Sequence, residues 1–301
     1  MIQSAAVAAL LIAAAGTLGL PDMLRITRIV LAGGSPRCSW PKAVQAPLHR
    51  EMINRVKNSL LAASRLETAD PAGYECWQTP AGRFWIAVGN QFLLPFNLAE
   101  QELQIYRGPE VAVRPGDVVL DCGANIGIFT REAIEAGAKL VVAVEPAPQN
   151  LECLRRNLKA EILAGRVIVY PKGVWDREDT LTLRVDPQNT AAASFVMGSE
   201  NWAQAVDVPL VPIDLLVEEL RLPRVDFIKM DIEGAETRAL HGARKTLSRW
   251  RPRLAISAYH LPEDPETIPA EVLAANGAYQ MRCGACEELK DYIRPIVQFF
   301  W

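Results

Sequence analysis

The chain has 301 residues, of which 50% are hydrophobic and 22% are charged, and its formal net charge is −3. This composition can bury a sizeable core and excludes a disordered protein. The near-neutral charge balance also argues against a nucleic-acid-binding protein, which needs a clearly basic face. We therefore expect one main globular domain and no nucleic-acid partner.

An apolar segment opens the chain. Residues 1–20 carry no charge, and residues 21–65 then hold eight Lys and Arg against two acids. Twenty helical residues at ~1.5 Å each reach roughly the 30 Å of a hydrocarbon core. Three interpretations remain open. The segment could be a cleaved signal peptide, a membrane anchor with Arg25 and Arg28 on the cytoplasmic side, or an alanine-rich helix packed on the protein. We predict an extension over residues 1–47, with membrane association through residues 1–30 as one alternative.

Residues 33–110 have a different sequence pattern from the rest of the chain. Residues 33–47 are rich in Gly and Pro and are typical of a linker. Residues 48–66 have apolar side chains at helical spacing, and residues 74–88 alternate around a Pro-Ala-Gly turn like a hairpin. We interpret residues 48–110 as a helical and hairpin lead-in.

After residue 110, short apolar runs alternate with helical patterns. Such alternation indicates βαβ units and a parallel sheet covered on both faces, which is an α/β fold. Residues 180–212 break the pattern and are predicted to be an insertion or loop. The main domain is therefore predicted over residues 111–301. The predicted strands are Val118–Leu120, Leu140–Val144, Val167–Tyr170, Asp226–Met230 and Leu254–Ala258.

The first predicted strand ends in a glycine-rich turn. Asp121 is followed by Gly123, Asn125 and Gly127 in a D-x-G-x-x-x-G pattern. Ligands of open parallel sheets bind beyond the carboxyl ends of the strands, and a helix N-terminus there favours an anion. The dinucleotide pattern G-x-G-x-x-G has a glycine where Asn125 stands, so this departure disfavours a pyrophosphate.

The second predicted strand ends in Glu145 and Pro146. Glu145 lies 24 residues after Asp121, where a carboxylate commonly accepts hydrogen bonds from ribose hydroxyls. A ribose without a pyrophosphate points to S-adenosylmethionine as the cofactor. Because this cofactor is supplied in the cytosol, we expect a cytoplasmic protein, either free or anchored to the cytoplasmic face of a membrane.

The fourth predicted strand runs into a charged block, K-M-D-I-E-G-A-E, at residues 229–236. Alternation along the strand sends Phe227, Lys229 and Asp231 to one face. A lysine in a central strand needs a carboxylate partner or a position facing the pocket. Asp231 and Glu236 either cap the next helix and pair with Lys229, or this strand end contacts the cofactor or the acceptor.

If S-adenosylmethionine donated its methyl group to a hydroxyl oxygen, a nearby proton acceptor would be needed. Asp231, Glu233 and His260 are the candidates, and Lys229 completes the set of candidate catalytic residues. His260 follows the fifth predicted strand, so we place it at the rim of the cleft, where its unperturbed pKa suits a base, although a loop histidine bonded to backbone is equally compatible. The same three residues could bind a divalent ion, but no repeated ligand spacing supports this, and we expect no metal.

Several motifs together resemble the FkbM-type methyltransferases. They are VRPGD at residues 113–117, VVLDCGANIG at 118–127, AVEPAPQNLECLRRNL at 143–158 and DFIKMDIEGAETRALHGA at 226–243. The resemblance covers about residues 74–285. It implies a Rossmann-like class I methyltransferase fold with a seven-stranded, mostly parallel sheet, and methylation of hydroxyl oxygens on sugars and secondary metabolites.

The resemblance also suggests roles for two further segments. Gly173 and Val174 follow the third predicted strand, where such enzymes commonly touch the adenine. Residues 189–196 would lie over the acceptor. The expected partner is thus a small-molecule or glycan hydroxyl acceptor, and the complete set of predicted cofactor contacts is Asp121, Gly123, Asn125, Gly127, Glu145, Pro146, Gly173, Val174 and Asp231.

Two alternatives remain at this point. One is a non-catalytic, membrane-tethered protein that binds the cofactor without turnover. The other is an NAD-dependent oxidoreductase, which both the glycine spacing and the K-x-D-x-E-G block argue against.

The lone C-x-x-C pair, Cys283 and Cys286, is interpreted as small thiols in a reducing compartment rather than as a metal or redox site.

Overall fold

The computed structural model describes residues 19–186, 189–196, 204–289 and 292–301. A seven-stranded sheet lies at its centre in the order β13-β16-β12-β11-β4-β5-β6. The five strands from β12 to β6 pair in parallel, whereas β16 runs antiparallel to both β12 and β13. The predicted Rossmann-like methyltransferase fold is confirmed. The strands are β4 (Val118–Cys122), β5 (Leu140–Val144), β6 (Val167–Tyr170), β11 (Phe227–Met230), β12 (Arg253–Ser257), β13 (Met281–Cys283) and β16 (Val297–Phe300).

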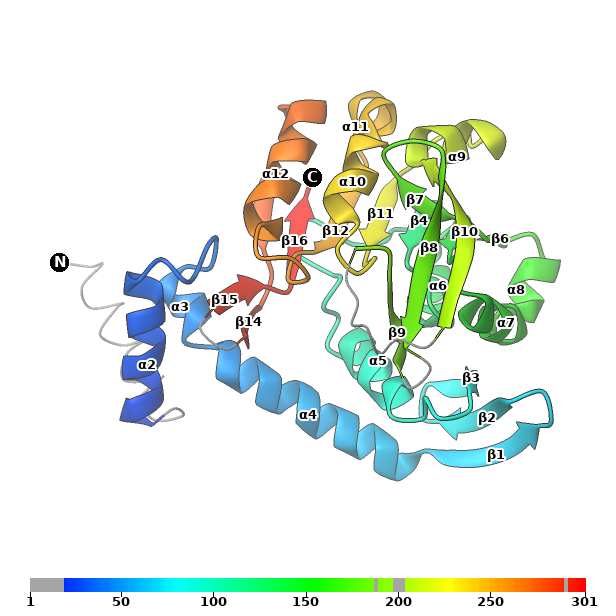
Figure 1. The fold of residues 1–301 in the computed structure, drawn as a ribbon, viewed down its shortest axis with the longest axis horizontal. Helices are drawn as coiled ribbons and strands as arrows, with labels where there is room; N and C mark the ends of the chain where they lie inside the picture. Colours follow the sequence, from blue (N-terminus) through cyan, green and yellow to red (C-terminus); the bar gives the residue numbers. More distant parts are fainter. Residues whose placement is uncertain (1–18, 187–188, 197–203, 290–291) are drawn as a thin grey trace.

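Helices cover both faces of this sheet (Figure 1). The strands consist almost entirely of buried apolar residues because neither face meets water. One face packs against α6 (Ile128–Glu135), α7 (Pro148–Asn157) and α8 (Lys159–Leu163). The other packs against α9 (Ile213–Glu219), α10 (Glu236–His241), α11 (Arg244–Trp250) and α12 (Asp264–Ala275). The helices α10 and α11 meet at Gly242 and Ala243.

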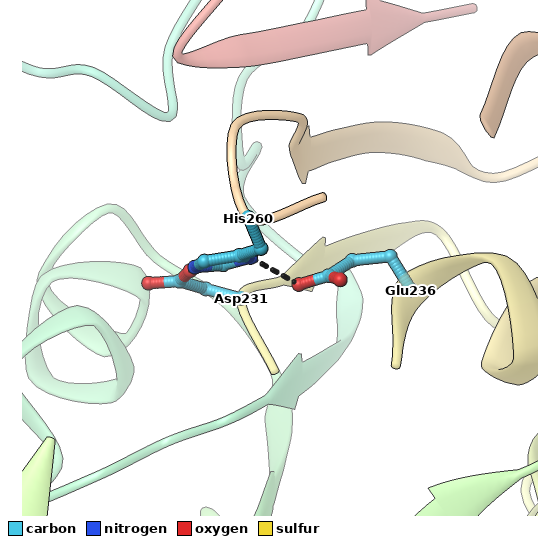
Figure 2. Close-up of side chains that lie close together, drawn as sticks. All are labelled: Asp231, Glu236 and His260. Carbon is cyan, nitrogen blue, oxygen red and sulfur yellow. Dashed lines mark hydrogen bonds and ion pairs between the residues drawn. The ribbon is translucent and has the colours of Figure 1, made fainter. Parts of the chain in front are cut away.

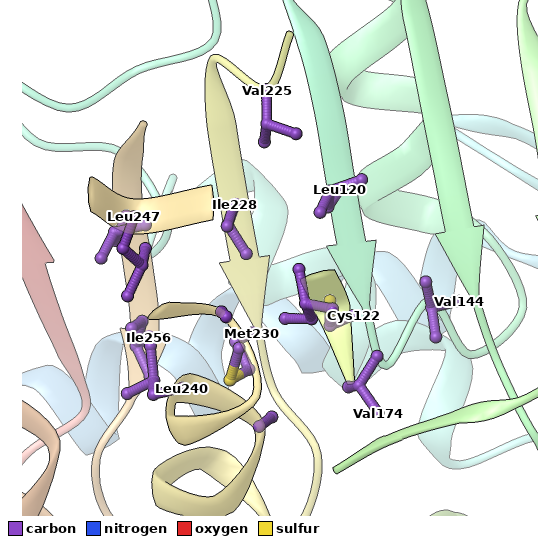
Figure 3. Close-up of a cluster of buried hydrophobic side chains, with 14 of the residues drawn as sticks. Leu120, Cys122, Val144, Val174, Val225, Ile228, Met230, Leu240, Leu247 and Ile256 are labelled. Atoms are coloured by element: carbon purple, nitrogen blue, oxygen red, sulfur yellow. The ribbon is translucent and has the colours of Figure 1, made fainter. Parts of the chain in front are cut away.

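Alternation along the strands decides which side chains meet which helices. Leu120, Ile228 and Met230 belong to the core cluster under α9–α12, where Leu240 and Leu247 meet them (Figure 3). Phe227 belongs to the cluster under α6–α8. The predicted alternation of residues 227–231 is therefore confirmed, and it places polar side chains of two strands on the α6 side.

A second sheet corrects the interpretation of residues 180–212 as a loop. Its order is β7-β10-β8-β9, and β10 pairs with β8 over seven residue pairs. The alternating Thr, Leu and Val residues of this region supply β-favouring side chains, although turn residues interrupt them. The strands are β7 (Gly173–Trp175), β8 (Asp179–Asp186), β9 (Asn189–Ser194) and β10 (Gln204–Pro212).

The lead-in precedes the central sheet. The long helix α4 (Ala46–Ala63) corresponds to the predicted helix over residues 48–66 and crosses the predicted boundary at residue 47. The predicted hairpin is present as β2 (Tyr74–Thr79) and β3 (Gly82–Ala87), and β1 (Arg65–Asp70) adds an unpredicted third strand. Two short elements, α2 (Leu20–Leu31) and α3 (Trp40–Ala43), come before α4, and α5 (Leu93–Glu102) follows β3.

A disulfide joins the extension to the C-terminal part of the chain. Cys38 is bonded to Cys286, which opens the two-stranded sheet of β14 (Cys286–Leu289) and β15 (Tyr292–Pro295). The interpretation of Cys286 as a small free thiol was wrong, because its partner lies 248 residues away in the sequence and only the fold brings the two together. Cys283, by contrast, is a buried free thiol.

Within the ranges that the structure describes, no helix has both the length and the apolar character that a membrane crossing requires. The predicted membrane association rests mainly on residues 1–18, which lie outside the described residues.

Candidate active site

The turn between β4 and α6 requires glycine at its first position. Gly123 has φ +79°, and a Cβ placed there would lie 1.9 Å from the backbone oxygen of Asp231. The ends of β4 and β11 can therefore approach closely only because Gly123 has no side chain. Asn125 also adopts a left-handed conformation, with φ +50°, and its N–H donates to Glu145 Oε2 at 2.8 Å.

Asp121 and Gly127, two of the predicted cofactor contacts, lie on the interior side of this turn. Asp121 is fully buried, accepts a hydrogen bond from Thr130 Oγ1 at 2.6 Å and pairs with Lys229. Gly127 precedes α6 with φ +90°, and a Cβ there would lie 2.7 Å from Leu158 Cδ1. Both face the interior of the domain and support its structure, and their contact with the cofactor stays a prediction.

Lys229 connects the strand ends. Its Nζ donates to the backbone oxygen of Gly123 at 2.8 Å and lies 3.3 Å from Asp121 Oδ1. Burial lowers the pKa of Lys229, but the carboxylates of Asp121 and Asp231 outweigh this and raise it above the ordinary value. The predicted carboxylate partner is thus present, and it is Asp121 rather than Asp231 or Glu236.

Glu145 lies at the carboxyl end of β5, and its carboxylate is held from several sides. Oε2 accepts the N–H of Asn125, and Oε1 accepts the N–H of Ala147 at 2.9 Å and the side-chain amide of Asn150 at 3.4 Å. Burial raises the pKa of Glu145, while these donors lower it. Oε2 keeps one of its two lone pairs free, and the 3.4 Å contact of Oε1 is weak, so the oriented carboxylate can still accept hydrogen bonds from a ligand.

One cavity of about 220 Å³ collects most of the predicted site residues. It opens beyond the carboxyl ends of β4, β5 and β11, which is where open parallel sheets bind ligands. Asp121, Gly127 and His260 lie outside its described lining. The predicted residues that do line it are Gly123, Asn125, Glu145, Pro146, Gly173, Val174, Lys229, Asp231 and Glu233.

A cluster of three carboxylates surrounds one histidine, and we call Asp231, Glu233, Glu236 and His260 the His260 cluster. Figure 2 shows Asp231, Glu236 and His260. The carboxylate of Glu236 is fully buried and accepts the N–H groups of Ile232 and Gly234, both at 2.9 Å. It therefore shapes the turn that carries Glu233, whose φ is +55°.

His260 does not fit the role expected from an unperturbed pKa. Burial lowers the pKa of its imidazole, but Glu236, Glu233 and Asp231 outweigh this and raise the pKa to about 10. The side chain is 3% exposed, so it lies behind the cavity rather than at its rim. At neutral pH this ring would be protonated, and the prediction that its ordinary pKa suits a base was wrong.

The two carboxylates on the cavity side differ in their surroundings. Burial raises the pKa of Asp231, but Lys229 and His260, together with a 2.8 Å hydrogen bond from Tyr106, bring it below the ordinary value. Burial raises the pKa of Glu233 to about 7, although His260 lowers it. Asp231 is thus an ionised acceptor, whereas Glu233 can exchange a proton near neutral pH.

Residues from the lead-in form a wall of the cavity that the sequence did not predict. One face of α5 contributes both apolar and polar side chains, and burial raises the pKa of Glu100 there to about 8. No motif precedes these residues, since α5 carries only ordinary helical spacing. The additional lining residues include Leu93, Phe96, Asn97, Glu100, Gln101, Tyr106, Phe195 and Tyr259.

Comparisons with known proteins agree with this geometry. The family model described as Methyltransferase FkbM domain matches residues 121–281. The 31-O-demethyl-FK506 methyltransferase FkbM of Streptomyces tacrolimicus is 28% identical over 159 residues, which cover 44% of this chain and 61% of that protein. The hexuronic acid methyltransferase AglP of Haloferax volcanii is 26% identical over 152 residues, which cover 50% of this chain and 59% of that protein. The chain thus spans about three fifths of the length of both relatives.

Among solved structures, methyltransferase FkbM from Methylobacillus flagellatus KT matches with a TM-score of 0.47 at 21% identity, covering 85% of this chain and 60% of that chain. The family model spans just over half of the present chain, including the glycine turn, Glu145 and the His260 cluster. The chain therefore belongs to the FkbM-domain methyltransferase family.

Proposed function

We propose that this protein transfers a methyl group from S-adenosylmethionine to a hydroxyl oxygen of a small molecule, sugar or glycan. The observation that carries the proposal is one cavity lined both by the oriented carboxylate of Glu145 and by the charged strand end from Lys229 to Glu233. The relatives named as methyltransferases of FK506 and of a hexuronic acid support this reaction class.

The cofactor would lie across the ends of β4 and β5. Glu145 would accept hydrogen bonds from the ribose hydroxyls, since its other contacts already hold its carboxylate in place. Gly173 and Val174 line the same cavity next to Pro146 and would contact the adenine. A Cβ at Gly173 would lie 2.3 Å from Leu210 Cδ2, so little space is spare on that side.

The acceptor would occupy the side of the cavity formed by α5 and the end of β11. Phe96 offers an apolar surface, while Asn97, Gln101 and Asp231 offer hydrogen-bonding groups. This mixture suits a sugar or polyketide-like hydroxyl compound, which has both apolar faces and several hydroxyls. The specific acceptor is set by this wall, because fold alone does not determine a substrate.

The reaction is an in-line displacement. The acceptor oxygen attacks the methyl carbon, the C–S bond breaks as the C–O bond forms, and S-adenosylhomocysteine leaves. The hydroxyl proton passes to the carboxylate pair of Asp231 and Glu233, which line the acceptor side.

Calorimetry tests the cofactor assignment first. S-adenosylmethionine should bind with one site per chain and NAD should not. Glu145→Ala should weaken S-adenosylmethionine binding by about 10- to 100-fold, because it removes hydrogen bonds to a charged acceptor worth about 1.5–3 kcal/mol. Glu178→Ala, which removes an exposed carboxylate, is the matched control and should bind like the unaltered protein.

Each result has a separate meaning. Binding of NAD instead, or of neither ligand, would overturn the proposal. Mass spectrometry of the reaction products detects methyl transfer. Binding of S-adenosylmethionine without methyl transfer to any hydroxyl acceptor would favour the non-catalytic alternative.

A further inference from the structure

The His260 cluster is rich in carboxylates. Asp231, Glu233 and Glu236 converge on a single imidazole, and Glu100 lines the same cavity. Lys229 pairs with Asp121 and also attracts the carboxylate of Asp231. Like charges at this density in a buried site favour binding of a cation.

Glu236 fixes the imidazole from one side. Its Oε1 lies 2.9 Å from His260 Nδ1, and Figure 2 shows the ring lying between this carboxylate and Asp231. Oε1 also accepts the N–H of Ile232, and Oε2 accepts that of Gly234, so both oxygens of Glu236 already take part in orienting the ring and its turn. Histidines that bind metals almost always donate their second ring N–H to a carboxylate, a backbone carbonyl or water.

The other ring nitrogen faces two oxygens at distances too long for hydrogen bonds. His260 Nε2 lies 3.5 Å from an oxygen of Asp231, Oδ1, and 3.6 Å from an oxygen of Glu233, Oε2. Both Nε2 and Oδ1 are buried, and neither has a hydrogen-bond partner among the described residues. Buried polar atoms without partners are uncommon in folded proteins and call for an explanation.

The distances from His260 Nε2 to the two carboxylate oxygens fit two edges of a metal coordination shell. Bonds of about 2.1 Å at tetrahedral angles place neighbouring ligand atoms roughly 3.4 Å apart. Ligand-type groups of Asp231, Glu236 and His260 lie within 4.8 Å of one another. Glu236 already contacts the imidazole of His260 and the N–H groups of the turn. The partly exposed Glu233 is therefore the better third ligand.

We propose that His260 Nε2, Asp231 Oδ1 and Glu233 Oε2 bind one divalent transition-metal ion at the acceptor side of the cavity, and that the ion displaces the Nε2 proton of the imidazolium to solvent. One imidazole and two carboxylates suit ions such as Zn²⁺ or Mn²⁺, whereas Mg²⁺ and Ca²⁺ favour all-oxygen sites. Glu236 is then a positioning residue that holds the ring through Nδ1.

The metal site deepens the proposed function and rests on it for its role. Since Asp231 and Glu233 line the cavity, an ion that they hold would meet the acceptor hydroxyl. The ion would lower the pKa of that hydroxyl, so that its proton could pass to solvent water, while Asp231 and Glu233 would serve as ligands instead of as the base of the metal-free reaction.

Titration of the full-length protein with metal tests the site directly. After treatment with EDTA and dialysis, the protein is titrated with Zn²⁺ and, separately, with Mn²⁺, by calorimetry and by electron paramagnetic resonance for Mn²⁺. One ion should bind per chain. His260→Gln and Glu233→Gln should each weaken binding by more than about tenfold, since each removes one ligand.

The control is a second histidine–carboxylate pair on the surface. His241 Nδ1 lies 3.4 Å from Glu271 Oε2, and the His241 side chain is about half exposed. His241→Gln should bind metal like the unaltered protein. Failure to bind either ion, or equal binding by all four proteins, would overturn the site.

A parallel titration with S-adenosylmethionine separates this proposal from the proposed function. Cofactor binding without metal binding would refute the site and leave the methyltransferase proposal standing. Circular dichroism checks that His260→Gln is folded. If that variant unfolds, Glu233→Gln still decides the outcome, because its side chain is partly exposed on a turn.

Discussion

Replacing Gly123 with alanine should disturb both the fold and the cofactor site. The new Cβ would lie 1.9 Å from the backbone oxygen of Asp231 and 2.9 Å from its carbonyl carbon. Real Cβ atoms essentially never come closer than 3.0 Å to such neighbours, so the ends of β4 and β11 must separate by about 1 Å. These neighbours are backbone atoms and cannot rotate away.

The cost has two parts. A left-handed conformation costs an alanine roughly 1–2 kcal/mol, and overpacking adds about 1–3 kcal/mol. Together they should lower the free energy of unfolding by about 2–5 kcal/mol. Gly165→Ala is the matched control, because Gly165 has φ +70° but no atom within 4 Å of the new Cβ. This control should show only the first part.

Urea unfolding followed by circular dichroism gives both free energies, and calorimetry gives the affinity for S-adenosylmethionine. Gly123→Ala should also lose affinity, because Asp231 and the glycine turn line the cavity. Equal destabilisation of the two variants would refute the close approach of β4 and β11. Unchanged cofactor affinity in Gly123→Ala would show that the turn does not shape the cofactor site.

Three further predictions concern buried charge and the disulfide. Lys229→Met leaves the Asp121 carboxylate buried without its partner, so urea unfolding should show a free energy of unfolding lower by about 3–5 kcal/mol. A decrease of less than about 1 kcal/mol would contradict the pairing. Burial raises the pKa of Glu132 from 4.5 to about 7. Between these two values the folded chain keeps a proton that the unfolded chain has lost. The contribution of Glu132 to the free energy of unfolding therefore falls as the pH rises from about 4.5 to about 7. Glu132→Gln should therefore gain stability at about pH 8 but not at about pH 4, and an equal gain at both would refute the assignment. Alkylation of the denatured, unreduced protein should label four cysteines by mass spectrometry, and labelling of Cys38 or Cys286 would disprove their disulfide.

The sheet and the glycine turn could be predicted because their signals are local. Apolar runs such as Leu140–Val144 must be strands buried on both faces when helical patterns separate them. The departure of Asn125 from the dinucleotide pattern and the spacing of Glu145 are equally readable. Residues at consecutive strand ends share one edge of a parallel sheet, so their convergence on one cavity follows from the strand pattern.

Long-range partners could not be predicted in this way. The wall formed by α5 and Tyr106 comes from a segment with no functional motif, and Tyr106 reaches Asp231 across 125 residues of chain. The bond between Cys38 and Cys286 likewise depends on how the extension folds back. Residues 180–212 looked irregular because turn residues interrupt strands that pair only within a sheet.

The amino-acid sequence by itself determined the family, the order of the main strands and which acids stand at their ends, since these depend on local spacing. Tertiary structure alone decided which of those groups meet the cavity and in which ionisation state. Burial and neighbouring charges set a pKa, and both depend on contacts between distant segments. Asp121 thus became the buried partner of Lys229, and His260 became a ring enclosed by three carboxylates.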